Sequence, residues 1–133
     1  MARIRGAHTR PEKTVRTFLR KKGLCLQLNA ALLPGKPDII IPDRRTAVFV
    51  NGCFWHGHSG CKRAVLPATR VEFWRTKIAG NIRRDRRNKA ALKKLGWQVV
   101  TIWQCQLTPK KIAARFRSLL ARLGGPEKGA RAR

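Results

Sequence analysis

The segment from Asn51 to Cys61 constrains this chain more than any other, because one loop combines thiols, imidazoles and large aromatic side chains. Cys53, His58 and Cys61 follow the spacing Cys-x4-His-x2-Cys, which is typical of metal ligands drawn from a single loop. Cys105 lies just after the last apolar strand candidate and is the best choice for a fourth ligand. We predict a closed Cys3His zinc site with a structural role; free buried thiols are the alternative.

The charge of the chain favours a polyanionic partner. Among 133 residues, 31 Lys and Arg stand against six acids, which gives a formal net charge of +25. Such an excess favours binding to DNA or RNA. A hydrophobic content of 43% is too high for a disordered polycation. A basic protein that binds nucleic acid without chemistry, of ribosomal or histone type, is the alternative at this point.

The chain has the length of one domain that can bury a core. We expect residues 9–123 to form that domain, residues 1–8 a flexible basic arm and residues 124–133 a flexible basic tail. The start lacks the apolar core of a secretory signal peptide, and we find no apolar run of membrane-spanning length. We therefore expect a reduced cytoplasmic protein, monomeric and without a membrane partner. Cys25 should be a small buried hydrophobe within an apolar strand.

Hydrophobic periodicity and turn residues predict the order α-β-β-β-α-β-α, a mixed α/β sheet flanked by helices. Two capping boxes, Thr9-Arg-Pro-Glu12 and Thr69-Arg-Val-Glu72, predict the starts of the first two helices. Residues 46–50 are continuously apolar, so we expect a central strand, paired as a hairpin with the strand at 38–41. The other expected elements are strands at 24–28 and 97–103, helix ends near 21 and 95, and a last helix from 108 to 123.

Because acidic residues are so few, each one that the chain keeps is a candidate for a specific role. Asp38 begins a strand and Asn51 follows the strand that should pair with it, so the two positions lie side by side. Glu12 could reach the same point. These oxygens favour Mg2+, which activates water and neutralises phosphate, and His56 could act as a proton donor. The structural alternatives are a helix cap for Glu12, an arginine pair for Asp38, and, for His56, zinc binding in place of His58.

Seven separated strings between about Thr9 and Cys105 are specific. They are Leu33-Pro-Gly-Lys-Pro-Asp38, Gly52-Cys-Phe-Trp-His56, Pro67-Ala-Thr-Arg-Val-Glu-Phe-Trp74, Lys77-Ile-x-x-Asn81, Arg84-Asp-Arg-Arg87, Leu95-Gly-Trp97 and Ile102-Trp-Gln-Cys105. Together they resemble the very short patch repair (Vsr) endonuclease family, a branch of the PD-(D/E)xK nuclease superfamily. The resemblance implies a restriction-endonuclease-like fold and a bacterial, nucleoid-associated enzyme. Such enzymes nick double-stranded DNA 5′ to the thymine of a G·T mismatch.

The resemblance also implies roles for individual residues. Asp38 would be the catalytic aspartate that ligates Mg2+, with the backbone carbonyl of Val50 as a second ligand and Glu12 near the waters of the metal. His56 would be the active-site histidine and Asp85 the helical acid near it. The implied zinc ligands agree with the spacing: Cys53, His58, Cys61 and Cys105. The aromatics implied to wedge into the base stack, for which core packing is the alternative, are Phe54, Trp55 and Trp74.

Asn51 departs from the family pattern, which usually has His or Asp there as general base or second metal ligand. An amide cannot take a proton from water, although its oxygen can contact a metal. Three explanations are open: a naturally slow enzyme, a base function carried by His56 or by water at the metal, or a deliberate substitution. The alternative functions are a non-catalytic zinc-stapled module that binds mismatched DNA and a related nuclease with another lesion specificity.

Overall fold

A computed structural model describes residues 10–28 and 32–124, so the expected arm at 1–8 and the expected tail beyond Gly124 lie outside the described residues. The described elements follow the predicted order in a mixed α/β single domain. They are α1 (Arg10–Lys21), β1 (Gln27–Leu28), β2 (Ile39–Ile41), β3 (Thr46–Asn51), α2 (Val71–Lys94), β4 (Gln98–Trp103) and α3 (Ile112–Leu123).

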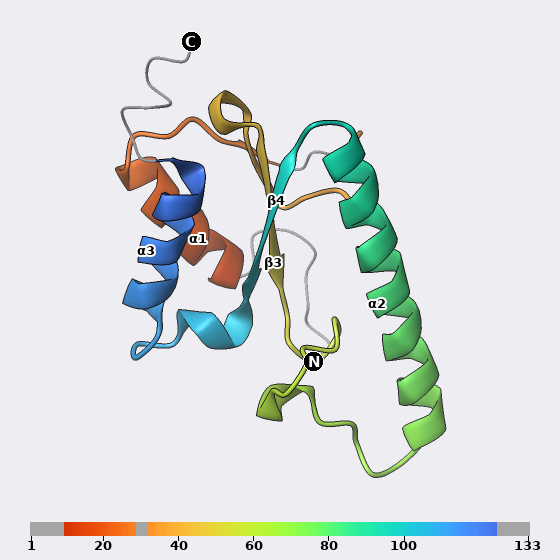
Figure 1. The fold of residues 1–133 in the computed structure, drawn as a ribbon. Helices are drawn as coiled ribbons and strands as arrows, with labels where there is room; N and C mark the ends of the chain where they lie inside the picture. The colour runs from red at the N-terminus through yellow and green to blue at the C-terminus, as the bar shows by residue number, and fades with distance from the viewer. Residues whose placement is uncertain (1–9, 29–31, 125–133) are drawn as a thin grey trace.

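A sheet with the strand order β1-β2-β3-β4 forms the centre of the described molecule (Figure 1). β2 and β3 pair antiparallel, which confirms the predicted hairpin and the central position of β3. β3 and β4 pair in parallel along their whole length, and the last pair is Asn51 with Trp103. A parallel pair needs a long crossover, which the chain makes through residues 52–70 and α2. Both strands therefore end at the same edge of the sheet.

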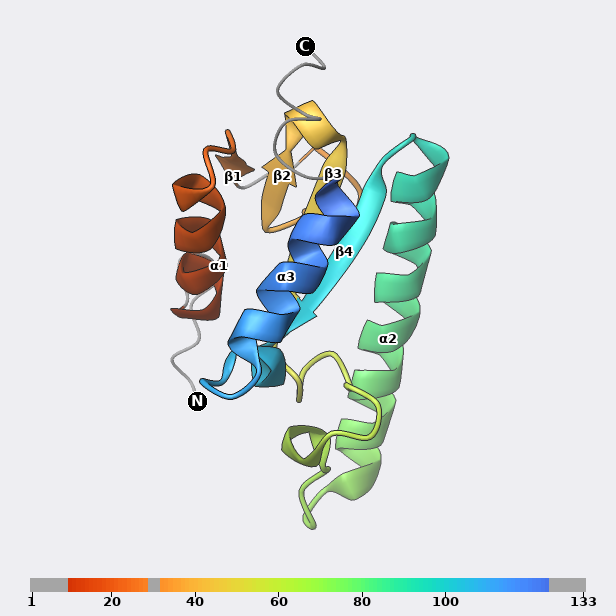
Figure 2. The same ribbon diagram turned by 60° about the vertical axis from the view of Figure 1, so that its left-hand side comes forward.

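The helices lie on both faces of the sheet. α1 and α3 cover one face and α2 covers the other (Figures 1 and 2). Because successive strand residues point to opposite faces, Ile39 and Ile41 enter one hydrophobic cluster and Ile40 enters the other. The larger cluster, between the sheet, α1 and α3, contains Val15, Leu19, Ile39, Ile41, Val48, Val100, Ile102, Leu119 and Leu123. The buried residues on the α2 side are Ile40, Ala47 and Leu92.

The first strand is shorter than predicted. β1 contains two residues, whereas residues 24–26 belong to no strand and do not pair with β2. Cys25 lies in that stretch and is exposed, so its prediction as a small buried hydrophobe was wrong. Leu24 and Leu26, on either side of it, pack against the larger cluster. Partly buried and exposed residues thus alternate from Leu24 to Leu28, beyond the paired residues of β1, and Cys25 falls on the exposed side.

Two helix starts also differ from the prediction. α2 begins at Val71 behind Arg70, whose backbone is left-handed at φ 53°. The capping box predicted from Thr69 does not form among the described residues, and the Glu72 carboxylate pairs with Arg75 instead. α3 begins at Ile112, because residues 108–111 form a turn in which the Ile112 N–H donates to the Thr108 carbonyl at 2.9 Å. None of the described helices is long and apolar enough to cross a membrane.

Candidate active site and metal centre

The loop that follows β3 packs against α2. The His58 N–H donates to the Cys53 carbonyl at 2.9 Å, which closes the loop into a tight coil. Gly57 has a φ of +58°, and a Cβ built there would lie 2.6 Å from Ile82 Cδ1 and 2.8 Å from Ile78 Cγ2. Glycine is therefore required at this position for the left-handed backbone and for the close approach to the helix.

The four predicted zinc ligands converge. Ligand atoms of Cys53, His58, Cys61 and Cys105 all lie within 4.8 Å of one another. Cys105 Sγ is 3.5 Å from His58 Nδ1, because the parallel pairing of β3 and β4 brings the two following segments together. Burial raises the pKa of the Cys53 thiol to about 11, and a cation bound here would instead stabilise the thiolate. Three sulfurs and one imidazole nitrogen fit a closed tetrahedral site in kind and number.

Trp103 orients the imidazole of this cluster. Its ring stacks on His58 with centroids 4.0 Å apart and an interplanar angle of 5°. The backbone N–H of Trp103 donates to Gln106 Oε1 at 3.0 Å, which holds the start of the segment after β4. Groups that fix the plane of a ligating imidazole commonly support metal sites. Sequence reasoning gave Trp103 no role, although its position two residues before Cys105 was a usable signal.

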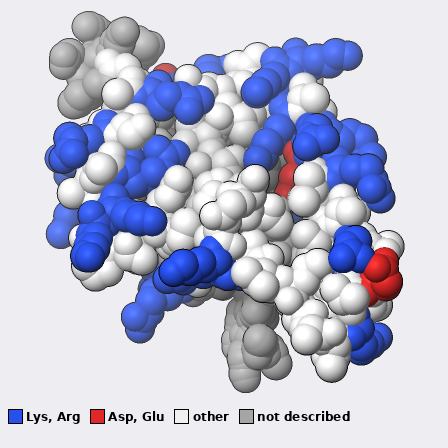
Figure 3. Space-filling model, turned by 60° about the horizontal axis from the view of Figure 1, so that its bottom comes forward, with Lys and Arg blue, Asp and Glu red and all other residues white. Residues whose placement is uncertain are grey.

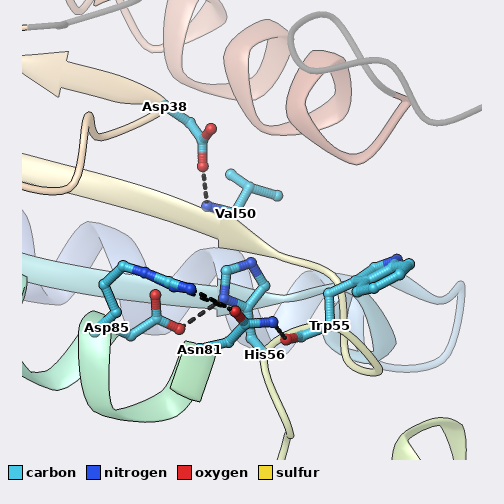
Figure 4. Close-up of polar contacts among 7 residues, drawn as sticks. Asp38, Val50, Trp55, His56, Asn81 and Asp85 are labelled. Carbon is cyan, nitrogen blue, oxygen red and sulfur yellow. Dashed lines mark hydrogen bonds and ion pairs between the residues drawn. The ribbon is translucent and has the colours of Figure 1, made fainter. Parts of the chain in front are cut away.

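A pair of carboxyl groups lies at the start of β2. The Val50 N–H donates to Asp38 Oδ2 at 2.7 Å (Figure 4), and Glu12, which is buried, hydrogen-bonds to the same carboxyl group. Burial raises the pKa of Asp38 to about 7; the Val50 N–H opposes this shift and the charge of Glu12 reinforces it. Two neighbouring carboxyl groups offer oxygen ligands of the kind that a divalent cation prefers.

Val50, which contacts this pair, and Asn51 are the last two residues of β3. The contact that Val50 makes with Asp38 uses its N–H, whereas the family resemblance implied its carbonyl as a metal ligand. Asn51 is 4% exposed and is paired with Trp103 across the parallel ladder. The hairpin and α1 thus bring together Asp38, Glu12 and Val50, with Asn51 as the next residue along the strand.

His56 is held by α2. Its Nδ1 lies 2.6 Å from Asp85 Oδ2 (Figure 4). Both side chains are partly exposed, 32% for His56 and 29% for Asp85, so the pair remains accessible. A carboxylate at Nδ1 fixes the tautomer and the ring orientation of His56. The structure therefore places His56 with Asp85, and His58 with the cysteines.

One helical turn before Asp85, Asn81 holds the residue that precedes His56. Asn81 Nδ2 donates to the Trp55 carbonyl at 2.8 Å. Arg84 donates to Asn81 Oδ1 through both terminal nitrogens, at 2.8 Å and 3.3 Å. Sequence reasoning assigned neither residue a role, although both stand in strings that resemble the family.

The predicted wedge residues form an aromatic cluster. Phe54 lies edge-on to Trp55 and to Trp74, each with ring centroids 5.3 Å apart, and Trp55 lies 5.6 Å from Trp74. Phe73 extends the cluster at 5.0 Å from Trp74 and is 46% exposed. These rings belong to neither hydrophobic cluster of the described core. Core packing is therefore a poor account of them.

Positive charge surrounds this end of the molecule. When the lower side of Figure 1 is brought forward, Lys and Arg side chains gather around a central region without charge, and acidic atoms are sparse (Figure 3). That side carries the loop after β3 and the start of α2. A basic rim of this kind suits a nucleic-acid backbone.

Known proteins are similar to this chain over most of its length. Residues 1–63 match the family described as DNA mismatch endonuclease Vsr. The type II nicking enzyme V.XorIIP of Xanthomonas oryzae pv. oryzae is 46% identical over 90% of this chain and 88% of its own length. The type II nicking enzyme V.NmeAIP of Neisseria meningitidis is 38% identical over 92% of this chain and 86% of its own length. DNA mismatch endonuclease Vsr of Escherichia coli is 42% identical over 80% of this chain and 68% of its own length.

Thiol reactivity tests the metal centre. In the metal-loaded protein we expect about one fast-reacting thiol, that of exposed Cys25, because metal-bound thiolates react slowly. Removal of the metal by a chelator should raise the number to about four, measured with Ellman's reagent and metal analysis. Cys25→Ser should abolish the fast phase and keep the metal, whereas Cys105→Ser should lose metal. Fast reaction of all the thiols in metal-loaded protein would contradict the site.

Substitution of Gly57 tests the packing of the loop on α2. Gly57→Ala should lower the free energy of unfolding by about 1–3 kcal/mol more than a left-handed alanine alone, because its Cβ meets two isoleucines. Gly60→Ala is a matched control, since Gly60 has a φ of +68° and its Cβ would meet nothing described within 4 Å. Denaturant unfolding of the metal-loaded proteins measures both. Equal losses would show that the close approach contributes nothing.

Proposed function

The chain belongs to the DNA mismatch endonuclease Vsr family, and from this premise we propose that it is a Mg2+-dependent repair endonuclease that nicks duplex DNA 5′ to the thymine of a G·T mismatch. The observation that carries the proposal is the arrangement at the end of β3 (Figure 4): Asp38 accepts the Val50 N–H, and the loop that follows this strand carries Trp55 and His56, which bonds to Asp85. Carboxylates beside a phosphate serve hydrolysis, because binding alone does not need them. The proposal is tested by incubating G·T and G·C duplexes with the protein and Mg2+ and looking for a single-strand nick in the G·T duplex alone.

Each residue of the proposed active site has a separate role. Asp38, together with the carbonyl of Val50, would hold Mg2+, and Glu12 would orient water near it. The ion would neutralise charge on the phosphate and favour ionisation of water. His56 would donate a proton to the leaving oxygen through Nε2, while the Asp85 carboxylate stabilises the charged imidazole.

We assign the cysteine cluster to structural Zn2+. Cys53, His58, Cys61 and Cys105 would fill all four positions of a tetrahedral site, which leaves none to activate water. The ion would join the loop after β3 to the segment after β4. It would thereby hold the intervening residues, which include His56, in place for DNA.

The aromatic cluster is proposed to open the duplex. Phe54, Trp55 and Trp74 would enter the base stack beside the mismatch, where unstacking costs less than in paired DNA. Their partial exposure and their position outside the described hydrophobic clusters support this role. We further propose that the protein acts as a monomer on nucleoid DNA in the bacterial cytoplasm. The basic segments at 1–8 and 124–133 would add attraction to the DNA backbone.

A non-catalytic module that binds mismatched DNA is the second candidate function. Asn51 favours it, because a buried amide stands where the family pattern has an ionisable residue. The two candidates share the zinc site, the basic surface and the aromatic wedge. They differ in whether a phosphodiester bond is broken, so nicking assays rather than binding assays separate them.

Asp38→Asn tests the proposed metal ligand. The amide oxygen can still accept the Val50 N–H, so the fold should persist, but the loss of charge should lower the nicking rate by at least about a hundredfold. The measurement is single-turnover cleavage of a strand-labelled G·T duplex in Mg2+, with EDTA and a G·C duplex as controls. Binding should be retained. Undiminished nicking by a folded variant would remove Asp38 from the mechanism.

Asn51→Asp tests whether the amide limits catalysis. A carboxylate could accept a proton or bind the metal, so we expect single-turnover nicking of the G·T duplex to rise by about tenfold or more. Asn51→Ala is the control and should not gain activity. An unchanged rate would rule out a base or ligand role at this position. Binding without nicking in Asn51→Asp would support the non-catalytic module.

A further inference from the structure

Helix α2 holds two consecutive residues of the loop. Asn81 Nδ2 donates to the Trp55 carbonyl at 2.8 Å, and Asp85 Oδ2 lies 2.6 Å from His56 Nδ1 (Figure 4). Residues 81 and 85 are four apart, so they project from the same side of the helix. The helix thus fixes both the peptide between Trp55 and His56 and the imidazole that follows it.

Arg84 determines which way the Asn81 amide faces. Its two terminal nitrogens donate to Asn81 Oδ1 at 2.8 Å and 3.3 Å. An amide whose oxygen accepts from a guanidinium must present its NH2 group on the other side, here towards the Trp55 carbonyl. If the amide turned over, its oxygen would oppose the carbonyl oxygen. A charge-assisted pair of donors is therefore suited to keep it in one orientation.

We infer that Arg84 and Asn81 are positioning residues that make insertion of Trp55 and alignment of His56 one event. Trp55 belongs to the aromatic cluster, and its carbonyl is bonded to the nitrogen of His56, so an anchored carbonyl sets the direction in which the His56 side chain leaves the backbone. A duplex that rejects Trp55 then leaves His56 out of register with the phosphate. The inference rests on the proposed function and adds a link between recognition and cleavage.

A simple phosphate contact is the competing role for Arg84, because its side chain is exposed. Loss of a phosphate contact lowers affinity and reduces the salt dependence of binding, and leaves the rate in the bound complex unchanged. Loss of a positioning residue instead lowers the rate in the bound complex. The two roles therefore separate when affinity and single-turnover rate are measured independently.

The experiment compares Arg84→Met with Arg87→Met. Arg87 is a matched control because it is exposed on the same helix. Each substitution removes one positive charge and leaves an unbranched side chain. Both should lose a few-fold in affinity for the G·T duplex, and Arg84→Met alone should also nick about tenfold more slowly at saturating protein. Arg84→Lys should recover part of the rate, because an ammonium can donate to Asn81 Oδ1. Equal nicking rates for the two methionine variants would overturn the inference.

A second measurement does not depend on cleavage. With 5-fluorotryptophan incorporated, the 19F signal of Trp55, assigned with Trp55→Phe, should shift or broaden in free Arg84→Met and stay unchanged in Arg87→Met. An unchanged Trp55 signal in Arg84→Met would contradict the positioning role. If the unsubstituted protein fails to nick the G·T duplex, the proposed function fails, whereas the Trp55 signal still decides whether Arg84 orders the loop.

Discussion

The parallel pairing of β3 with β4 is the constraint on which both candidate sites depend. It ends the two strands at one edge, with Asn51 opposite Trp103, so the loop after β3 meets the segment that carries Cys105. Parallel pairing also demands a crossover, and α2 provides it. The same helix then supplies Asn81 and Asp85 to the loop. One strand pairing thus brings the candidate metal ligands together and positions His56.

Within that loop, neighbouring residues serve different partners. Cys53 is buried among the candidate metal ligands, Trp55 joins the aromatic cluster, and His56 bonds to α2. Gly57 then lets the backbone approach the helix before His58 returns to the cysteines. A loop held by several different contacts loses little further entropy when it acts, which favours a preorganised site.

Features that depend on the local sequence pattern were predicted correctly. Features that depend on contacts with distant residues were not. The apolar run at 46–50 and the cysteine spacing were sufficient for the central strand and the metal cluster. Cys25 was misplaced, because apolar neighbours suggest a strand whereas a ladder also needs a paired neighbour. Asn81 was missed for a related reason: it bonds to a backbone carbonyl, and which carbonyl an amide meets depends on how the loop folds, not on residue type.

The buried acids show how local physics overrides overall charge. In a chain of net charge +25, simple attraction should keep every carboxyl group ionised, yet burial and Glu12 raise the pKa of Asp38 to about 7. Desolvation acts over the few ångströms around the group, whereas distant arginines are screened by water and salt. A divalent cation bound beside Asp38 would offset the desolvation of its carboxylate. The acid pair is therefore strained as a structural element and well suited as a metal site, which is the pattern expected where stability is sacrificed for function.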